Sequence, residues 1–127
     1  YDTVTVVLKT ASGKQAIINN SRQAVYGYDQ RVEALGTKGM ALSENRRAHE
    51  MTLHSADFTD RAEPLLNFFI ERYREAFDAE ISEFVEAVET GRAPSVGFED
   101  GRLALVLAEA ALKSISEGRV VAVKELN

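Results

Sequence analysis

Apolar and polar residues alternate along the first part of the chain. One side of a period-two pattern carries only apolar residues, Val4, Val6 and Leu8, while the other side is mostly polar. This alternation is typical of a half-buried strand. A turn signal, Ala-Ser-Gly-Lys, separates this strand from a second one over residues 15–22. The pattern therefore predicts a β-hairpin over residues 3–22.

Three further strands are predicted before the middle of the chain. Residues 28–36 alternate, and the turn sequence Gly-Thr-Lys-Gly then leads into a short strand over residues 40–43. Residues 48–54 form a fifth predicted strand, and residues 55–64 a loop.

The second half of the chain has a helical period. An apolar stripe runs along one helix face through Phe77, Ile81, Phe84, Val85 and Val88. It predicts a helix over residues 66–90, with a break near Arg74 as an alternative. Gly91 and then Pro94 end the helix in the usual way.

A second helix is predicted to begin at Glu99 and Asp100, whose negative charge suits the N-terminal end of a helix. It runs to about Glu117, and Gly118 stops it. Residues 120–123 are predicted to form a last short strand.

Strands followed by helices indicate an α+β fold, with an open, predominantly antiparallel sheet and the helices packed on one face. The other face of the sheet is more apolar than a solvated face should be. It is predicted to carry Thr3, Thr5, Val7, Ile17, Asn19 and Leu35. Another subunit could cover this face, because exposed apolar patches usually mark interaction sites. The alternative is an ordinary solvated face of an antiparallel sheet.

Composition excludes several classes of protein. A chain of 127 residues has the length of one domain, and 45% hydrophobic residues suffice for a core. The net charge of −5 argues against nucleic acid as a partner. Cysteine is absent, so there is no disulfide and no thiolate metal site, which fits a reducing cytoplasm. No apolar run approaches the length of a membrane span, and we find no signal peptide. A strand at the very first residues suggests a piece of a longer chain.

No complete active site is present in the sequence. It lacks Gly-x-Gly-x-x-Gly, the Walker lysine loop and Gly-x-Ser-x-Gly. His49 and His54 are five residues apart in a predicted strand, so they should point to opposite faces. His54 with Asp57 would give two ligands where zinc needs three or four, so we expect no metal site.

The segment Tyr26-Gly27-Tyr28-Asp29-Gln30-Arg31 has the most distinctive chemistry. A glycine between two aromatic residues suggests a bulge or a close backbone approach. Its hydroxyl and carboxylate groups could form directional hydrogen bonds with a polyol or sugar. Alternatively, the two tyrosines simply pack on neighbouring strands.

Several stretches resemble one known family. They are residues 19–22, 26–33, 36–40, 72–80, 94–101 and 110–120, which together span almost the whole chain. They are similar to the C-terminal domain of the inositol dehydrogenases, a branch of the glucose-fructose oxidoreductase/Idh/MocA family of NAD(P)-dependent dehydrogenases. The glycine turn and the Glu-Gly-Arg ending are common to the wider family, whereas Tyr-Gly-Tyr-Asp-Gln-Arg is more specific to the inositol branch.

The resemblance implies a longer, cytoplasmic enzyme of inositol catabolism, in which separate domains bind the cofactor and the substrate. NAD(H) or NADP(H) would bind an N-terminal Rossmann domain, and a lysine in Glu-Lys-Pro with an Asp-x-x-x-His pair would carry the acid and base chemistry. This chain has none of these elements. It would therefore be the C-terminal substrate-binding and oligomerisation domain over residues 1–127, incomplete at its N-terminal side. It would hold no catalytic, cofactor-binding or metal residue, and would be inactive alone.

The resemblance also implies which residues contact substrate. Tyr28 matches a family tyrosine that reaches the substrate hydroxyls, with Tyr26 and Asp29 beside it, although Asp29 could instead cap the turn. Tyr73 and Phe77 match an aromatic pair whose second member is often tyrosine in inositol dehydrogenases. Phe77 therefore removes one hydroxyl, which a related polyol or an inositol isomer would tolerate.

For the assembly, the resemblance implies a homodimer or homotetramer formed through the sheet face, with no nucleic acid or membrane partner. The alternatives are a non-catalytic sugar-binding or assembly module, or a dehydrogenase for another sugar.

Overall fold

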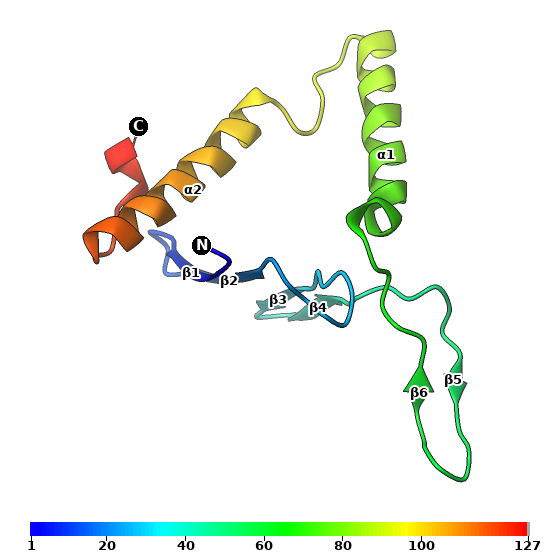
Figure 1. Ribbon diagram of the computed structural model, residues 1–127. Helices are drawn as coiled ribbons and strands as arrows, with labels where there is room; N and C mark the ends of the chain where they lie inside the picture. Colours follow the sequence, from blue (N-terminus) through cyan, green and yellow to red (C-terminus); the bar gives the residue numbers. More distant parts are fainter. Residues whose placement is uncertain (127) are drawn as a thin grey trace. The chain divides into compact units, whose positions relative to one another are not determined.

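The computed structural model describes residues 1–126 and contains strands, two long helices and a short 3-10 helix (Figure 1). The elements in chain order are β1 (Thr3–Lys9), β2 (Gln15–Ser21), β3 (Val32–Gly36), β4 (Gly39–Ser43), β5 (Thr52–Leu53), β6 (Arg61–Ala62), α1 (Phe69–Thr90), α2 (Phe98–Glu117) and η1 (Val123–Leu126). The α+β class is confirmed.

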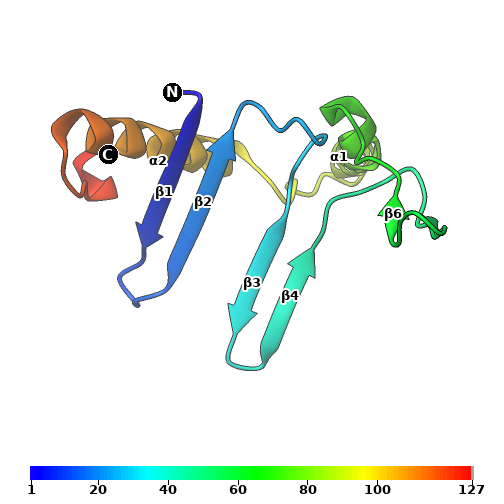
Figure 2. The ribbon, with the colours of Figure 1, turned by 60° about the horizontal axis from the view of Figure 1, so that its bottom comes forward.

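The strands pair as hairpins, β1 with β2, β3 with β4 and β5 with β6, giving three two-stranded sheets within the described residues (Figure 2). β3 and β4 are antiparallel with Val32 opposite Ser43 and Gly36 opposite Gly39, and β5 and β6 are antiparallel as well. Predominantly antiparallel pairing is therefore confirmed.

The predicted hairpin over residues 3–22 is also confirmed. Its turn is closed by the Thr10 amide, which donates to the Lys14 carbonyl at 2.9 Å, and by the Gly13 amide, which donates to the Thr10 carbonyl at 3.0 Å. Along β1, Val4, Val6 and Leu8 are half-buried while the residues between them are exposed, as the alternation predicts.

Two predicted strands are shorter than expected. The strand predicted over residues 28–36 begins only at Val32, because the amides of residues 28 and 30 donate to partners outside a strand ladder. The strand predicted over residues 48–54 is reduced to β5, and its partner β6 lies within the predicted loop 55–64.

The two helices match their predictions closely. α1 is continuous over 22 residues, so the alternative of a break near Arg74 is wrong. It begins at Phe69 instead of residue 66, because the Leu66 amide donates to the Arg46 carbonyl at 3.0 Å. At the start of α2, the Gly97 amide donates to the Asp100 carboxylate at 2.7 Å, and Gly118 caps the other end.

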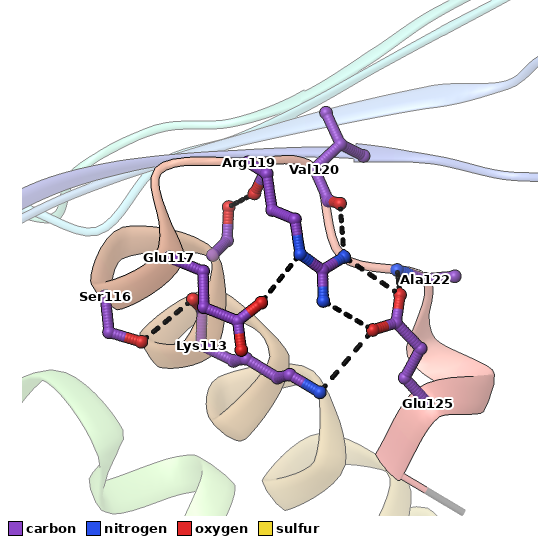
Figure 3. Close-up of polar contacts among 8 residues, drawn as sticks. Lys113, Ser116, Glu117, Arg119, Val120, Ala122 and Glu125 are labelled. Atoms are coloured by element: carbon purple, nitrogen blue, oxygen red, sulfur yellow. Dashed lines mark hydrogen bonds and ion pairs between the residues drawn. The ribbon is translucent and has the colours of Figure 1, made fainter.

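The last strand predicted, over residues 120–123, is wrong. The chain instead turns back into η1, and a cluster of charged residues holds it there (Figure 3). The Arg119 guanidinium donates to the Glu125 carboxylate at 2.7 and 3.2 Å and to Glu117 at 2.6 Å. Glu125 also accepts from the Ala122 amide at 2.8 Å and pairs with Lys113 at 3.4 Å. These bonds close a turn where a strand would have to extend.

The chain divides into two compact units. The first comprises residues 1–4 and 19–79, and it contains the predicted site. The second comprises residues 5–18 and residues from 80 onward, including α2 and η1. Among the described residues, the buried apolar side chains are Ala87, Val106 and Ala110, all in the second unit. In the first unit large apolar side chains remain exposed, and Leu35 on β3 has 82% of its surface accessible.

Candidate functional site

Gly27 brings the segment Tyr26–Arg31 close to the chain that precedes α1. Its φ of +123° lies in a region that favours glycine. A Cβ at this position would lie 2.7 Å from the Leu65 Cβ and 3.2 Å from the carbonyl oxygens of Leu65 and Leu66. The close backbone approach predicted at Gly27 is therefore confirmed.

Tyr28 is positioned by its backbone and by an aromatic neighbour. Its amide donates to the Leu66 carbonyl at 2.8 Å. Its ring meets the Tyr73 ring edge-on, with centroids 5.6 Å apart and planes at 84°. Tyr73 in turn meets Phe77, one helical turn further along α1, at 6.2 Å and 63°. We call Tyr28, Tyr73 and Phe77 the aromatic row.

Burial and the neighbouring charges act on Tyr73. Its partial burial and its hydrogen-bonding interaction with Tyr28 raise the pKa of the Tyr73 hydroxyl. The Arg72 guanidinium lies 5.7 Å from the centre of the Tyr73 ring. Both tyrosines of the aromatic row are half-buried, whereas Phe77 is 44% exposed at its end. The row therefore presents phenol groups at one end and an apolar edge at the other.

Asp29 is the centre of a separate hydrogen-bonded group, which we call the Asp29 cluster: Tyr26, Asp29, Arg31 and Asn45. The Tyr26 hydroxyl donates to Asp29 Oδ2 at 2.5 Å, and Arg31 donates to both carboxylate oxygens at 2.8 and 2.9 Å. Asn45 Nδ2 donates to Asp29 Oδ1 at 2.8 Å. The bonds from Arg31, Tyr26 and Asn45 hold the pKa of the Asp29 carboxyl far below its usual range. The bond to Asp29 raises the pKa of Tyr26.

The predicted site residues thus fall into two groups. Tyr26 and Asp29 line an open cavity of about 1120 Å³, together with Gly27, Arg31, Asn45, Arg47, Glu63, Leu65, Asn67 and others. Tyr28, Tyr73 and Phe77 do not line it and form the aromatic row instead. Within the segment Tyr26–Arg31, the side chains of Tyr26 and Asp29 therefore line the cavity, whereas the side chain of Tyr28 belongs to the aromatic row.

Sequence reasoning missed Asn45 and Arg46, which follow β4. Asn45 Oδ1 accepts from the Gln30 amide at 2.7 Å, and Arg46 forms a two-fold ion pair with Glu75 of α1 at 2.9 and 3.1 Å. The Glu75 side chain remains 77% exposed while making this pair. The amide–carboxylate contacts of Asn45 join residues about fifteen positions apart, so no local sequence pattern identifies them.

Neither a metal-ligating cluster nor a glycine-rich dinucleotide turn is found in the described part of the chain. Within residues 1–126 no group of three or more metal-ligating side chains is found, and His54 Nδ1 accepts from the Asp60 amide at 3.3 Å. The sequence lacks the glycine-rich turn of a Rossmann dinucleotide-binding unit, and β3–β6 pair as antiparallel hairpins. Neither long helix combines the length and apolar character needed to cross a bilayer.

Comparison with known proteins gives consistent results. Residues 1–123 match the family described as oxidoreductase family, C-terminal alpha/beta domain, of the Gfo/Idh/MocA group. The chain is 47% identical to an inositol 2-dehydrogenase of Rhizobium meliloti, with 97% of this chain and 37% of that protein covered. It is 44% identical to a myo-inositol 2-dehydrogenase of Thermotoga maritima, with 98% and 37% covered.

Solved structures agree with these relatives. A probable dehydrogenase from Thermotoga maritima superimposes with a TM-score of 0.94 at 44% identity, covering 99% of this chain and 38% of that one. A myo-inositol dehydrogenase from Corynebacterium glutamicum gives 0.90 at 45% identity, covering 95% and 36%. The chain thus spans a little over a third of the length of the relatives it matches. Together with the α+β fold, these matches show that the chain belongs to the Gfo/Idh/MocA oxidoreductase family and is its C-terminal α/β domain.

Proposed function

We propose that this chain is the substrate-side domain of an NAD(P)-dependent dehydrogenase that oxidises one carbinol group of myo-inositol or a related polyol. The curated relatives at 47% and 44% identity are both inositol 2-dehydrogenases, which supports this substrate class. The parent enzyme would work in the cytoplasm. It would bind NAD(H) or NADP(H) and carry its acid–base residues outside this chain.

The observation that carries the proposal is the aromatic row. Tyr28 and Tyr73 present two phenol groups within one edge-on pair. A phenol can both donate and accept a hydrogen bond, which matches the hydroxyls of a polyol. Tyr28 is the first candidate for substrate contact and Tyr73 the second, with Tyr26 and Asp29 bordering the site.

Phe77 would reduce the number of hydrogen bonds that the pocket can form with a polyol. It lies beside Tyr73 and offers ring edge where a tyrosine would offer a hydroxyl. A polyol bound there would make one hydrogen bond fewer. This favours a substrate that does not need that contact, such as an inositol isomer.

The domain would also assemble the enzyme as a homodimer or homotetramer through the strand faces. On β3 and β4, Leu35, Met40 and Leu42 share one face by register, and between 49% and 82% of their surfaces are accessible. Apolar side chains exposed together in this way indicate a surface that another protein surface covers.

The test uses the full-length protein that contains this chain. Formation of NADH or NADPH is followed, with NAD and NADP supplied in turn, using myo-inositol, scyllo-inositol and a hexose as substrates. We expect turnover with at least one inositol, and a KM raised roughly tenfold by Tyr28→Phe, which removes one hydrogen bond to substrate. Tyr1→Phe removes the same atom from a residue that is 84% exposed, and should leave KM unchanged.

Two results would contradict the proposal. Absence of turnover with every inositol would exclude the substrate class. Polyol oxidation by residues 1–127 alone would show that the chain carries the chemistry we place elsewhere in the parent enzyme.

A further inference from the structure

We propose that Asp29 and Asn45 are positioning residues that set the place of Tyr28, and that the Asp29 carboxylate does not itself bind substrate. This inference rests on the proposed function, because it assigns Tyr28 the contact with the polyol. It adds a residue, Asn45, that neither the sequence pattern nor the comparisons identify.

The hydrogen-bonding capacity of Asp29 is fully used. An ionised carboxylate offers about four acceptor positions, two on each oxygen. Oδ1 accepts from Arg31 Nε and Asn45 Nδ2, each at 2.8 Å. Oδ2 accepts from the Tyr26 hydroxyl at 2.5 Å and from Arg31 Nη2 at 2.9 Å. No acceptor position is left for a substrate hydroxyl, although Asp29 lines the cavity.

Asn45 fixes the chain on the C-terminal side of Tyr28 through both ends of its amide. Its nitrogen donates to the Asp29 side chain, and its oxygen accepts from the Gln30 backbone amide at 2.7 Å. Asn45 is half-buried, so these two bonds are partly shielded from water. A hydrogen bond to a charged partner is stronger than a neutral one, which makes the contact with Asp29 the stronger restraint.

The N-terminal side of Tyr28 is fixed independently. The Tyr28 amide donates to the Leu66 carbonyl, and Gly27 lies directly against Leu65. With the backbone held on both sides, the ring of Tyr28 packs against the ring of Tyr73 in an edge-on arrangement. Loss of the Asn45 contacts releases one flank and lets the phenol group move away from the position that a substrate requires.

A double-mutant cycle in the full-length enzyme tests the inference. The variants are Tyr28→Phe, Asn45→Ala and the two combined, with Asn20→Ala as control. Asn20 is exposed on β2 and does not line the cavity. KM for the polyol, kcat, KM for the dinucleotide and the melting temperature are measured for each.

We expect Asn45→Ala to raise the polyol KM about tenfold. In the Tyr28→Phe background, the same change should raise KM less than twofold, because the residue acts through the Tyr28 hydroxyl. The KM for the dinucleotide should not change, and Asn20→Ala should match the unmodified enzyme. Asp29→Asn and Tyr28→Phe form a second double-mutant cycle. Asparagine has nearly the same shape as aspartate, so this cycle can replace the first one if Asn45→Ala does not fold.

The possible results distinguish failure of the proposed function from failure of the positioning role of Asp29 and Asn45. Absence of turnover with every inositol would overturn the proposed function. An unchanged KM in Tyr28→Phe, in an enzyme that does oxidise inositol, would overturn the substrate contact of Tyr28 and this inference with it. If Tyr28→Phe raises KM but the effects of Asn45→Ala or Asp29→Asn simply multiply with it, only the inference is overturned. Such additivity for Asp29→Asn would mean that the carboxylate contacts substrate directly.

Discussion

Replacing Gly27 with alanine tests the geometry on which the whole site depends. The added methyl group would stand 2.7 Å from the Leu65 Cβ, which is closer than Cβ atoms approach in real structures. It would also press on two backbone carbonyl oxygens at 3.2 Å, and backbone cannot rotate away as a long side chain can. The φ of +123° is an additional strain for any residue with a side chain.

The cost can be estimated from these two effects. Holding a non-glycine residue at such a φ costs roughly 1–3 kcal/mol. Forcing an extra methyl group into a filled space costs about 1–3 kcal/mol more. The sum is about 2–6 kcal/mol of the free energy of unfolding, which is a large share of the stability of a typical domain.

Gly39→Ala is the matched control, because Gly39 has a φ of +146° but nothing within 4 Å of its added Cβ. It should show the backbone strain alone. Melting temperatures of the full-length variants are compared by calorimetry, with a shift of about 2–4 °C expected per kcal/mol. We expect Gly27→Ala to melt clearly below Gly39→Ala. Equal melting temperatures would show that the segment carrying Leu65 moves aside freely, and that Gly27 does not fix the place of Tyr28.

Three further predictions concern other parts of the chain. Phe77→Tyr should lower the myo-inositol KM of the full-length enzyme about two- to tenfold by adding a hydrogen bond, and an unchanged KM would remove Phe77 from the pocket. The bonds from Arg119 and the Ala122 amide lower the pKa of Glu125 from 4.5 to about 2, so its stabilising effect is complete above pH 4.5 and lost as the pH falls toward 2. Glu125→Gln should therefore flatten the decline in melting temperature over that interval, and an unaltered decline would contradict this. Leu35→Lys should lower the mass measured by light scattering, whereas Thr37→Lys in the adjacent turn should not; equal masses would count against an interface on this strand face.

The sequence predicted the elements whose signals are local. The alternation of Val4, Val6 and Leu8 defined β1, and the apolar stripe through Phe77 defined α1. The prediction of a strand over residues 120–123 was wrong because it rested only on the local run of β-branched and small residues. That run carries no information about the ion pair between Arg119 and Glu125, which flank it. Those two side chains bind each other across the segment and close it into a turn.

The sequence suggested candidate site residues but not their arrangement. Resemblance predicted five substrate contacts together, namely Tyr28, Tyr26, Asp29, Tyr73 and Phe77, and the structure places the rings of Tyr28, Tyr73 and Phe77 in one row. The division that separates them from Tyr26 and Asp29 depends on Gly27 meeting Leu65, a contact between segments almost forty residues apart. Asn45 was missed for the same reason, since its partners are distant in sequence and it lies in no recognisable motif.

The fully hydrogen-bonded carboxylate of Asp29 also has a consequence for the pH dependence of the rate expected of the parent enzyme. Asp29 stays ionised well into the acid range, while the pKa values of Tyr26 and Tyr73 are raised above that of a free phenol. These three groups therefore keep the same protonation state throughout the interval in which an enzyme normally operates. Under the proposed function, any inflection near neutrality in a plot of rate against pH should therefore come from groups other than these three.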